Sequence, residues 1–428
     1  MSTELNRREF LGRSMAGGAV LAAGLNVAAQ DAAPVDPVIV GVVGMNRGKA
    51  LALDFVKAPG CRIKYVCDLD RNRLEEGKAA IGEASGQAPE GVGDFRRILD
   101  DPEVDAVAFA LPVHWHAPAA ILACKAGKHV YVEKPCCHNP REGELLVEAA
   151  RKYNRCVQMG AQRRSAVVIG EGMKKMAGGT LGRVYYARGW YAAQRGSIGR
   201  GEVTNPPEYL DYDLWQGPAP RRPYKSNVIP YNWHWFWHYG TGEAGNNGTH
   251  MFDLGRWGLG VDYPVRVTAA GGRYRFNDDQ ETPDTLMTTY DFDGGKTLTW
   301  EGLSCNQPGP EGMFVGITFY GENGSMIVGH TNYILRDANG KVVEEKDGDV
   351  GGIDHIINFL NAIRTGTPSS LNCDIETGYK STLLAHLGNI AHRTGRALRC
   401  GEQGHILDDA DAQALWQREY EPGWEPTA

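Results

Sequence analysis

The stretch His129-Val130-Tyr131-Val132-Glu133-Lys134-Pro135 decides the fold of this chain. Its first half is mostly apolar, β-branched or aromatic, which predicts a short strand buried in a parallel sheet. The strand ends in the charged pair Glu133-Lys134, which a proline stops. Open α/β sheets place their chemistry just beyond the carboxyl ends of their strands, so Lys134 is a candidate proton donor or acceptor with a pKa lowered by burial. This stretch alone also allows an ordinary surface lysine.

The residues before this stretch repeat a pattern of strand followed by helix. Apolar runs at 38–44, 63–67 and 105–111 predict further buried strands, and helical patterns follow at 49–57 and 119–126. Strands that alternate with helices in this way specify a parallel, doubly wound sheet. The predicted fold class of the first half is therefore α/β.

A glycine turn follows the first predicted strand and consists of Gly44, Met45, Asn46, Arg47 and Gly48. A strand, a glycine turn and a helix N-terminus form the phosphate cradle of a dinucleotide-binding (Rossmann) fold. The fingerprint is incomplete, because Asn46 stands where a second glycine is usual.

An acidic residue at the end of the second predicted strand supports a dinucleotide cofactor. Asp68 would accept hydrogen bonds from an adenosine ribose and repel a 2′-phosphate, which favours NAD. Arg71 lies close behind and keeps NADP open.

The glycine turn, the pair Pro112 and His116, and Glu133-Lys134-Pro135 together resemble the Gfo/Idh/MocA family of nicotinamide-dependent oxidoreductases, whose members mostly act on sugars, inositols and their derivatives. The resemblance covers nearly the whole chain after the N-terminal signal. It implies a Rossmann domain, a C-terminal α+β domain with an open, mostly antiparallel sheet, and a tightly bound cofactor. The expected units are a signal at 1–29, the Rossmann domain at 36–160, the α+β domain at 161–352, and helices returning toward the first domain with a tail at 353–428.

The same resemblance assigns roles to individual residues. Lys134 and His250 would flank the reacting carbon of the substrate, and Asn246, one helical turn before His250, would orient a hydroxyl. Gln162 and Arg163, in the crossover to the second domain, would contact the substrate. The candidate cofactor-binding residues are Gly44, Asn46, Arg47, Gly48, Asp68, Arg71, Pro112, Trp115, His116 and Glu133.

A long insertion rich in proline and aromatic residues spans 194–239. Segments of this length without regular structure are usually functional, and flat sugar rings stack on Trp and Tyr. His238 and Tyr239 are the insertion residues expected to face the substrate, because they lead into the segment that carries Asn246 and His250. The open sheet of the same domain predicts a homo-oligomer.

The N-terminus resembles a twin-arginine export signal, with Arg7-Arg8 ahead of a mildly apolar, Gly- and Ala-rich run. This predicts a periplasmic or otherwise exported protein of the family branch that includes glucose–fructose oxidoreductase, with the signal cleaved near Ala29 or kept as an anchor. No other run is long and apolar enough to predict a transmembrane segment.

Composition narrows the classes of partner. The net charge of −7 gives no reason to expect nucleic acid. The nine cysteines show no Cys-x-x-Cys and no spacing typical of zinc, so no metal is expected.

Three functions stay open at this point. The first is an oxidoreductase acting on a sugar or polyol, the second is a redox-assisted glycoside hydrolase or lyase, and the third is a non-catalytic sugar-binding protein. Lys134 and His250 favour catalysis, and Lys134 favours the first function over the second.

Overall fold

The computed structural model describes residues 36–428. The expected export signal at 1–29 lies outside these residues. Contacts divide the chain into residues 1–37 and residues 38–428, and the second unit contains both sheets of the protein. Among the described residues, no helix combines the length and apolar character that a membrane crossing requires.

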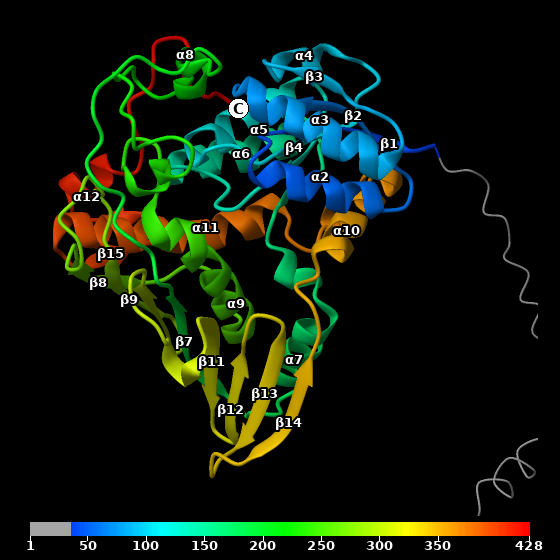
Figure 1. Ribbon diagram of the computed structural model, residues 1–428. Helices are drawn as coiled ribbons and strands as arrows, with labels where there is room; N and C mark the ends of the chain where they lie inside the picture. The colour runs from blue at the N-terminus through cyan, green and yellow to red at the C-terminus, as the bar shows by residue number, and fades with distance from the viewer. Residues whose placement is uncertain (1–35) are drawn as a thin grey trace, which may run out of the picture. The chain divides into compact units, whose positions relative to one another are not determined.

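The first sheet has six parallel strands in the order β3-β2-β1-β4-β5-β6 (Figure 1). This confirms the predicted doubly wound sheet. One face is covered by α2, α3 and the late helix α10, and the other face is covered by α4, α5 and α6. The strands are β1 (Val38–Val43), β2 (Cys61–Cys67), β3 (Glu90–Val92), β4 (Ala106–Phe109), β5 (His129–Val132) and β6 (Val157–Met159). The helices are α2 (Arg47–Lys57), α3 (Arg71–Ser85), α4 (Arg96–Asp100), α5 (Val113–Lys125), α6 (Pro140–Lys152) and α10 (Gly352–Thr365).

The second sheet has ten strands in the order β14-β13-β12-β11-β7-β10-β9-β8-β15-β16. Within it β7 and β10 run parallel, and the other paired neighbours are antiparallel. The predicted open, mostly antiparallel sheet is therefore confirmed. The strands are β7 (Val184–Ala192), β8 (Arg266–Gly272), β9 (Thr285–Phe292), β10 (Lys296–Leu303), β11 (Val315–Gly321), β12 (Gly324–Val328), β13 (Asn332–Asp337), β14 (Val342–Asp347), β15 (Leu398–Cys400) and β16 (Ile406–Leu407).

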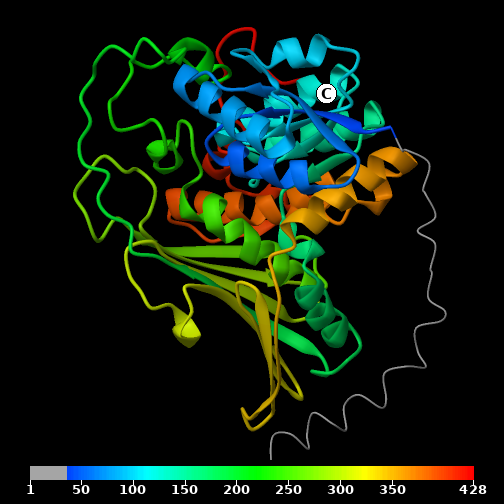
Figure 2. The same cartoon turned by 45° about the vertical axis from the view of Figure 1, so that its right-hand side comes forward.

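Helices cover one face of this second sheet (Figure 2). They are α7 (Val167–Ala177), α9 (Thr249–Leu259) and α11 (Ile375–Thr394). The opposite face carries threonines, the stacked pair Tyr186 and Tyr320, and the ion pair of Arg188 with Glu301. This face is mixed in character, and Met287 is 53% exposed on it. The homo-oligomer stays a prediction.

The C-terminal part of the chain contributes to both domains. Helix α10 packs against α2 of the first domain, whereas α11 lies between α6 and α9. Strands β15 and β16 then extend the edge of the second sheet. The tail, which ends after the short helix α12 (Ala410–Ala414), therefore joins the two domains as well as returning to the first.

Candidate active site

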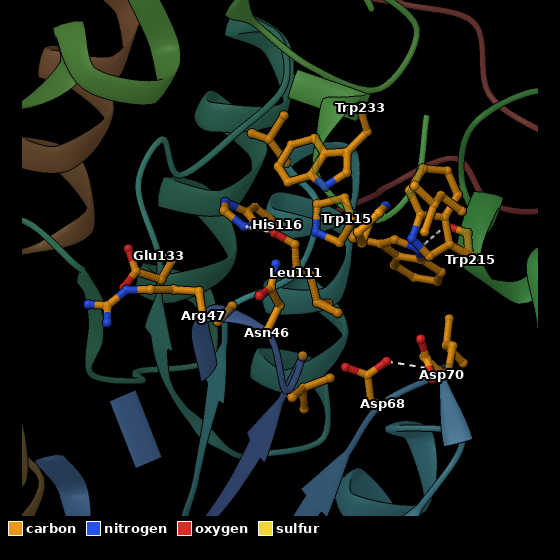
Figure 3. Close-up of a pocket in the computed structure, with 18 of the residues that line it drawn as sticks. Asn46, Arg47, Asp68, Asp70, Leu111, Trp115, His116, Glu133, Trp215 and Trp233 are labelled. Carbon is orange, nitrogen blue, oxygen red and sulfur yellow. Dashed lines mark hydrogen bonds and ion pairs between the residues drawn. The ribbon is translucent and has the colours of Figure 1, made fainter. Parts of the chain in front are cut away.

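A cavity of about 320 Å³ opens beyond the carboxyl ends of β1, β2, β4 and β5, beneath the insertion (Figure 3). Its lining includes Gly44, Asn46, Arg47, Asp68, Pro112, Trp115, His116, Glu133, Lys134 and Asn246, all singled out from the sequence. Residues that the sequence did not single out also line it, among them Asp70, Arg73, Trp215, Tyr231, Trp233 and His234.

The turn after β1 has the geometry of a phosphate cradle. Gly44 has φ of +91°, and a Cβ there would lie 2.4 Å from the carbonyl oxygen of Ala110, so only glycine fits. Helix α2 begins at Arg47, and its N-cap residue Asn46 makes no side-chain cap. The first turn of α2 contains no acidic side chain, so its positive dipole end is not neutralised locally. Gly48 is buried in α2.

The carboxylate of Asp68 is fixed at the adenosine end of the cavity. It accepts the main-chain N–H of Met45 at 2.6 Å and that of Asp70 at 2.8 Å. Burial raises the pKa of Asp68, and the two N–H donors oppose this shift. Arg71 was expected nearby, but its guanidinium turns away to donate to the main-chain oxygen of Glu208 at 2.6 Å. Arg73, two residues further along α3, lines the cavity instead.

Tryptophans from separate elements form one wall of the cavity (Figure 3). The indole N–H of Trp115 donates to the main-chain oxygen of Trp215 at 3.0 Å. Because α5 begins at Val113, earlier than the sequence predicted, Trp115 and His116 lie in its first turn. His116 faces the carbonyl oxygens of Pro135 at 2.6 Å and Leu111 at 2.7 Å, so its ring ties two cavity-lining turns together.

Lys134 reaches the second domain from the end of β5. Its Nζ donates to the main-chain oxygen of Asn246 at 2.5 Å and lies 3.3 Å from the side-chain Oδ1 of the same residue. Burial lowers the pKa of Lys134, while the negative charge of Glu133 opposes the shift. Glu133 is itself held by Arg47, whose Nε lies 3.1 Å from its Oε1.

The segment that carries Asn246 is not the regular α-helix that the sequence predicted. Residues Ala244–Gly248 form a π-helical turn that runs directly into α9. Such turns occur frequently at functional sites. Here the turn presents Asn246 to the cavity. His250, in the first turn of α9, lies outside the cavity lining, and burial together with the positive charges of Lys134 and Arg163 lowers its pKa well below the usual range.

Glu243 supports this turn and was missed in the sequence. It is buried, and its carboxylate pairs with Arg195 at 2.8 Å, accepts the Ser304 hydroxyl at 2.9 Å and accepts the amide of Asn247. No pattern in its own segment marks it, because Arg195 and Ser304 lie on other segments. Burial of the charged partners within one network holds the turn against the sheet.

The insertion contributes different residues from those expected. His238 and Tyr239 do not line the cavity. His238 faces the carbonyl oxygen of Pro220 at 2.8 Å, and Tyr239 is buried and donates to Gln216 at 3.1 Å. Instead, Tyr231, Trp233 and His234 reach the cavity, because the insertion folds on its own core of Leu210, Trp215, Ala219, Val228, Phe236 and Tyr239.

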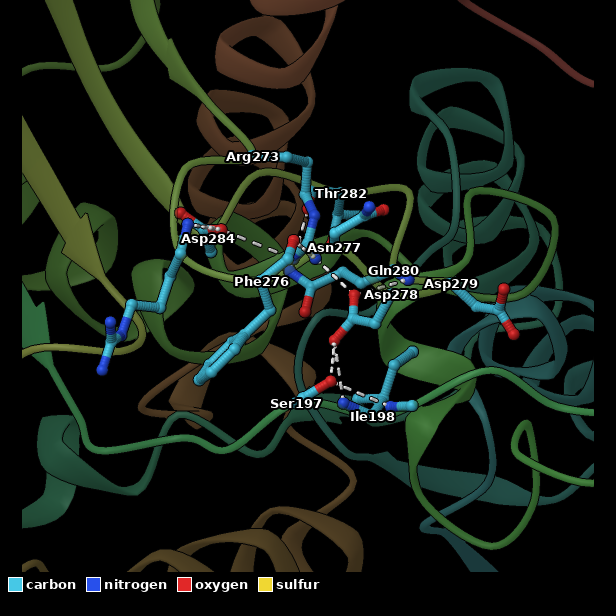
Figure 4. Close-up of polar contacts among 12 residues, drawn as sticks. Ser197, Ile198, Arg273, Phe276, Asn277, Asp278, Asp279, Gln280, Thr282 and Asp284 are labelled. Atoms are coloured by element: carbon cyan, nitrogen blue, oxygen red, sulfur yellow. Dashed lines mark hydrogen bonds and ion pairs between the residues drawn. The ribbon is translucent and has the colours of Figure 1, made fainter.

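Aspartates on the loop between β8 and β9 anchor this insertion (Figure 4). Asp278 accepts the hydroxyl of Ser197 at 2.7 Å and the N–H of Ile198 at 2.9 Å, and it also pairs with Arg273. Asp279 pairs with Lys225 at 2.8 Å. The insertion is therefore tied down at both its beginning and its middle.

The crossover to the second domain contains two consecutive arginines in different settings. Arg164 pairs with the buried Asp253 at 2.8 Å. Arg163 is 5% exposed and donates to the ring of His330 at 3.1 Å. Gln162 precedes them and is partly exposed.

Two charged residues of the first domain are buried. Lys128 donates to the main-chain oxygens of Asp101 and Val104 at 2.6 and 2.9 Å. Glu142 is fully buried and accepts hydrogen bonds from Arg418 and Tyr420 in the tail. The partners of Glu142 lie far along the chain.

Comparison with known sequences identifies both domains. Residues 38–161 match the "Oxidoreductase family, NAD-binding Rossmann fold" of the Gfo/Idh/MocA proteins, and residues 189–425 match the "Oxidoreductase family, C-terminal alpha/beta domain". The chain belongs to the Gfo/Idh/MocA oxidoreductase family. Its N-terminal domain is thus an NAD-binding domain.

Relatives within the Gfo/Idh/MocA family carry two kinds of name. A "Glycosyl hydrolase family 109 protein" of Saccharopolyspora erythraea is 33% identical over 181 residues, which are 37% of this chain and 39% of that protein. A "Levoglucosan dehydrogenase" of Pseudarthrobacter phenanthrenivorans is 34% identical over 98 residues, which are 23% of this chain and 25% of that protein. The chain therefore spans well under half the length of these relatives.

Solved structures show the same fold over a longer stretch. A levoglucosan dehydrogenase in complex with NADH and levoglucosan has a TM-score of 0.65 and 20% identity, covering 85% of this chain and 99% of that one. At this identity the likeness establishes the fold alone.

The residues of this chain fit NAD. The Gly44 turn offers a cradle for a pyrophosphate, Asp68 is positioned to accept ribose hydroxyls, and the wall of Trp115 and Trp233 supplies flat apolar surface. When bound, the nicotinamide supplies the hydride acceptor or donor of the family's chemistry.

Proposed function

We propose that this protein is an NAD-dependent oxidoreductase that interconverts a hydroxyl and a carbonyl group on a sugar, polyol or glycoside. The observation that carries the proposal is Lys134, which lies half-buried at the end of a Rossmann strand and donates to Asn246 of the second domain at the cavity. Its lowered pKa suits an amine that must both take up and release a proton. The names of the levoglucosan dehydrogenases agree with this substrate class.

In the oxidation direction the neutral amine of Lys134 accepts the proton of the substrate hydroxyl. The carbon that bears this hydroxyl would lose its hydrogen as hydride to the nicotinamide, and its C–O bond becomes C=O. The hydrogen bond from Nζ to the main-chain oxygen of Asn246 uses one N–H and leaves the lone pair for the hydroxyl. In the reverse direction, the ammonium group returns that proton to the carbonyl oxygen.

In this proposal Asn246 orients the substrate hydroxyl, and His250 is a second proton-transfer group beside Lys134. The pKa of His250 lies well below its usual range, so the imidazole is neutral at pH 7 and can accept or donate a hydrogen bond. Asn246 cannot take a proton, and its side-chain amide lies within 3.5 Å of Tyr231 and Glu243. Lys134 is accordingly the principal proton-transfer group, and His250 is the second.

A redox-assisted glycoside hydrolase or lyase is the second candidate, because relatives of this chain bear the name glycosyl hydrolase family 109. In that reaction transient oxidation of the sugar would acidify a neighbouring C–H, and elimination would break the glycosidic bond. A non-catalytic sugar-binding role is the least favoured, since it does not explain the presence of Lys134 and His250.

The experiment is single-turnover absorbance at 340 nm with the full chain loaded with NAD. A panel of pyranosides and polyols should include at least one compound that produces bound NADH. Nitrophenyl glycosides serve as the second arm: release of nitrophenol without accumulation of NADH would favour the hydrolase. If NAD binds and the panel yields neither signal, the proposal is wrong.

A further inference from the structure

Arg163 is a buried cation that the protein does not neutralise. Its side chain is nearly excluded from solvent, and one guanidinium nitrogen, Nη1, is buried without a hydrogen-bond partner among residues 36–428. No carboxylate in this described part of the chain lies within ion-pair distance of it. Burial alone lowers the pKa of Arg163 to about 10. An unpaired buried charge is costly, so such a group normally has a partner.

The neighbouring residue shows that this arrangement is not general to the segment. Arg164 has a buried carboxylate, Asp253, which also accepts the hydroxyl of Ser381 at 2.8 Å. Two adjacent guanidinium groups thus enter the same interior, and the chain supplies an anion for only one of them. The guanidinium of Arg163 has a histidine as its partner instead.

That histidine adds a second donor. His330 lies on the exposed turn between β12 and β13, and its Nδ1 faces Nη2 of Arg163 at 3.1 Å. Burial and the charge of Arg163 lower the pKa of His330, so its ring is neutral at pH 7. Because Arg163 can only donate, Nδ1 accepts, and the ring proton is placed on Nε2. The pair therefore offers a positive charge and an outward N–H.

The pair does not line the cavity of about 320 Å³, but it lies within electrostatic reach of His250. The charges of both Lys134 and Arg163 act on His250, as does His330. The carboxylates near Lys134 already have partners, since Glu133 pairs with Arg47 and Glu243 pairs with Arg195. Positive charge at this end of the site is therefore in excess, and the missing anion is most simply part of the substrate.

We propose that Arg163 and His330 form a carboxylate subsite and that the substrate is a sugar acid, such as a uronic acid or its glycoside. This inference rests on the proposed function, because it names the substrate class of the same site. Guanidinium groups bind carboxylates strongly and with defined geometry. Neutral sugars of the same ring shape would leave Arg163 uncompensated.

The test compares matched ligands that differ only at C6. Dissociation constants are measured by calorimetry for methyl glucuronide against methyl glucoside, and for methyl galacturonide against methyl galactoside, with the full chain loaded with NADH. The acid of at least one pair should bind about 10- to 100-fold tighter than its neutral partner, as expected for hydrogen bonds to a charged group. High salt should reduce this ratio.

Substitutions test whether Arg163 and His330 cause the difference in affinity between the acid and the neutral ligand. Arg163→Met should bring the ratio close to one, with the larger loss of affinity on the acid of each pair. His330→Ala changes an exposed side chain and should reduce the ratio in part, which keeps the test decisive if Arg163→Met fails to fold. Arg62→Met, the same change on β2 away from the cavity, should keep the full ratio.

Each outcome decides the question. Equal affinity within both pairs would overturn the carboxylate subsite, as would equal loss of acid and neutral ligand in His330→Ala. Competition by acetate or sulfate as strong as that by the uronide would show a site for small anions and overturn the sugar-acid assignment. Because binding is measured without turnover, a failure of the proposed redox function would appear separately, as NAD that no ligand of either class reduces.

Discussion

Nζ of Lys134 lies 2.5 Å from the main-chain oxygen of Asn246, so the amine at the end of a strand of the first domain is held by the π turn of the second. Because the acceptor is a main-chain oxygen, no change of side chain at that position removes it. The hydrogen bond also fixes the direction in which the amine points. The hydrogen bond therefore makes the position of the Lys134 amine, the proposed proton-transfer group, depend on how the two domains are joined.

The first prediction concerns the chemistry of Lys134. Lys134→Ala should retain bound NAD and lose about 10²- to 10⁴-fold in the rate of bound NAD reduction, because a general base is removed. Lys134→Arg should lose nearly as much, since a guanidinium keeps the charge but does not release a proton at usable pH. Single-turnover absorbance at 340 nm measures both.

The pH profile of the unmutated chain is the matching control. The active form in oxidation is the neutral amine, and the pKa of Lys134 is lowered by burial, so the rate should rise with pH and level off below the usual range of lysine. The rise attributable to Lys134 should be missing in Lys134→Arg. Full activity in Lys134→Ala would contradict the assignment.

The second prediction concerns the choice of nucleotide. Asp68 is fixed by two main-chain donors where a 2′-phosphate would meet it as a like charge. Asp68→Ala should therefore weaken NAD binding and narrow or reverse the preference over NADP, as measured by titration with both nucleotides. Arg71→Ala should leave the preference unchanged, since Arg71 faces Glu208. Tighter NADP binding by the unmutated chain would refute this account.

The third prediction concerns stability. Asp253 is almost fully buried and neutralises Arg164, so Asp253→Ala should lower the free energy of unfolding by about 3–5 kcal/mol because it leaves an unpaired buried charge. Glu322→Ala, which removes the exposed partner of Arg183, should cost at most about 1 kcal/mol. Urea denaturation compares the two, and equal effects would show that the buried pair adds nothing.

The fourth prediction is a homo-oligomer formed through the outer face of the ten-stranded sheet. That face combines Tyr186, Tyr320 and the exposed Met287 with polar groups. Light scattering should give a mass well above 46.8 kDa, and Met287→Lys should shift it downward. A monomer mass for the unmutated chain would exclude this interface.

The fifth prediction is export of the folded protein, which rests on Arg7-Arg8 in the residues that the structure does not describe. Replacing both arginines by lysine should keep the protein in the cytoplasm, as determined by cell fractionation. A change of Arg62 to lysine is the control. Unaltered export of the double variant would disprove the signal.

The fold could be predicted from local sequence patterns, whereas the site depends on contacts between residues that are far apart in the sequence. The strand before Lys134 and the turn at Gly44 follow from short-range chemistry, because apolar periodicity and a positive φ restrict which residues fit. The insertion has no such periodicity. Asp278 and Asp279, far along the chain, help to fix its path, so the choice of His234 over His238 as the cavity residue was not visible locally.

Buried charged residues were the second feature that could not be predicted from the sequence. The buried position of Glu142 cannot be predicted from its neighbours in the sequence, because its partners Arg418 and Tyr420 come from the tail. Partners so far apart in the sequence produce no recognisable spacing of residues. A carboxylate is also normally exposed unless it is paired. The π turn at Asn246 is similar, since its stabilising carboxylate, Glu243, has partners on three different segments.

The contact of Trp115 with Trp424 has a consequence for biosynthesis. The two rings meet edge to face with centroids 5.2 Å apart, so Trp115, the first domain's tryptophan in the wall of the NAD cavity, is backed by a residue far along the chain. Trp424 leaves the ribosome long after Trp115. The first domain therefore emerges with its glycine turn complete but with this tryptophan unsupported until Trp424 follows.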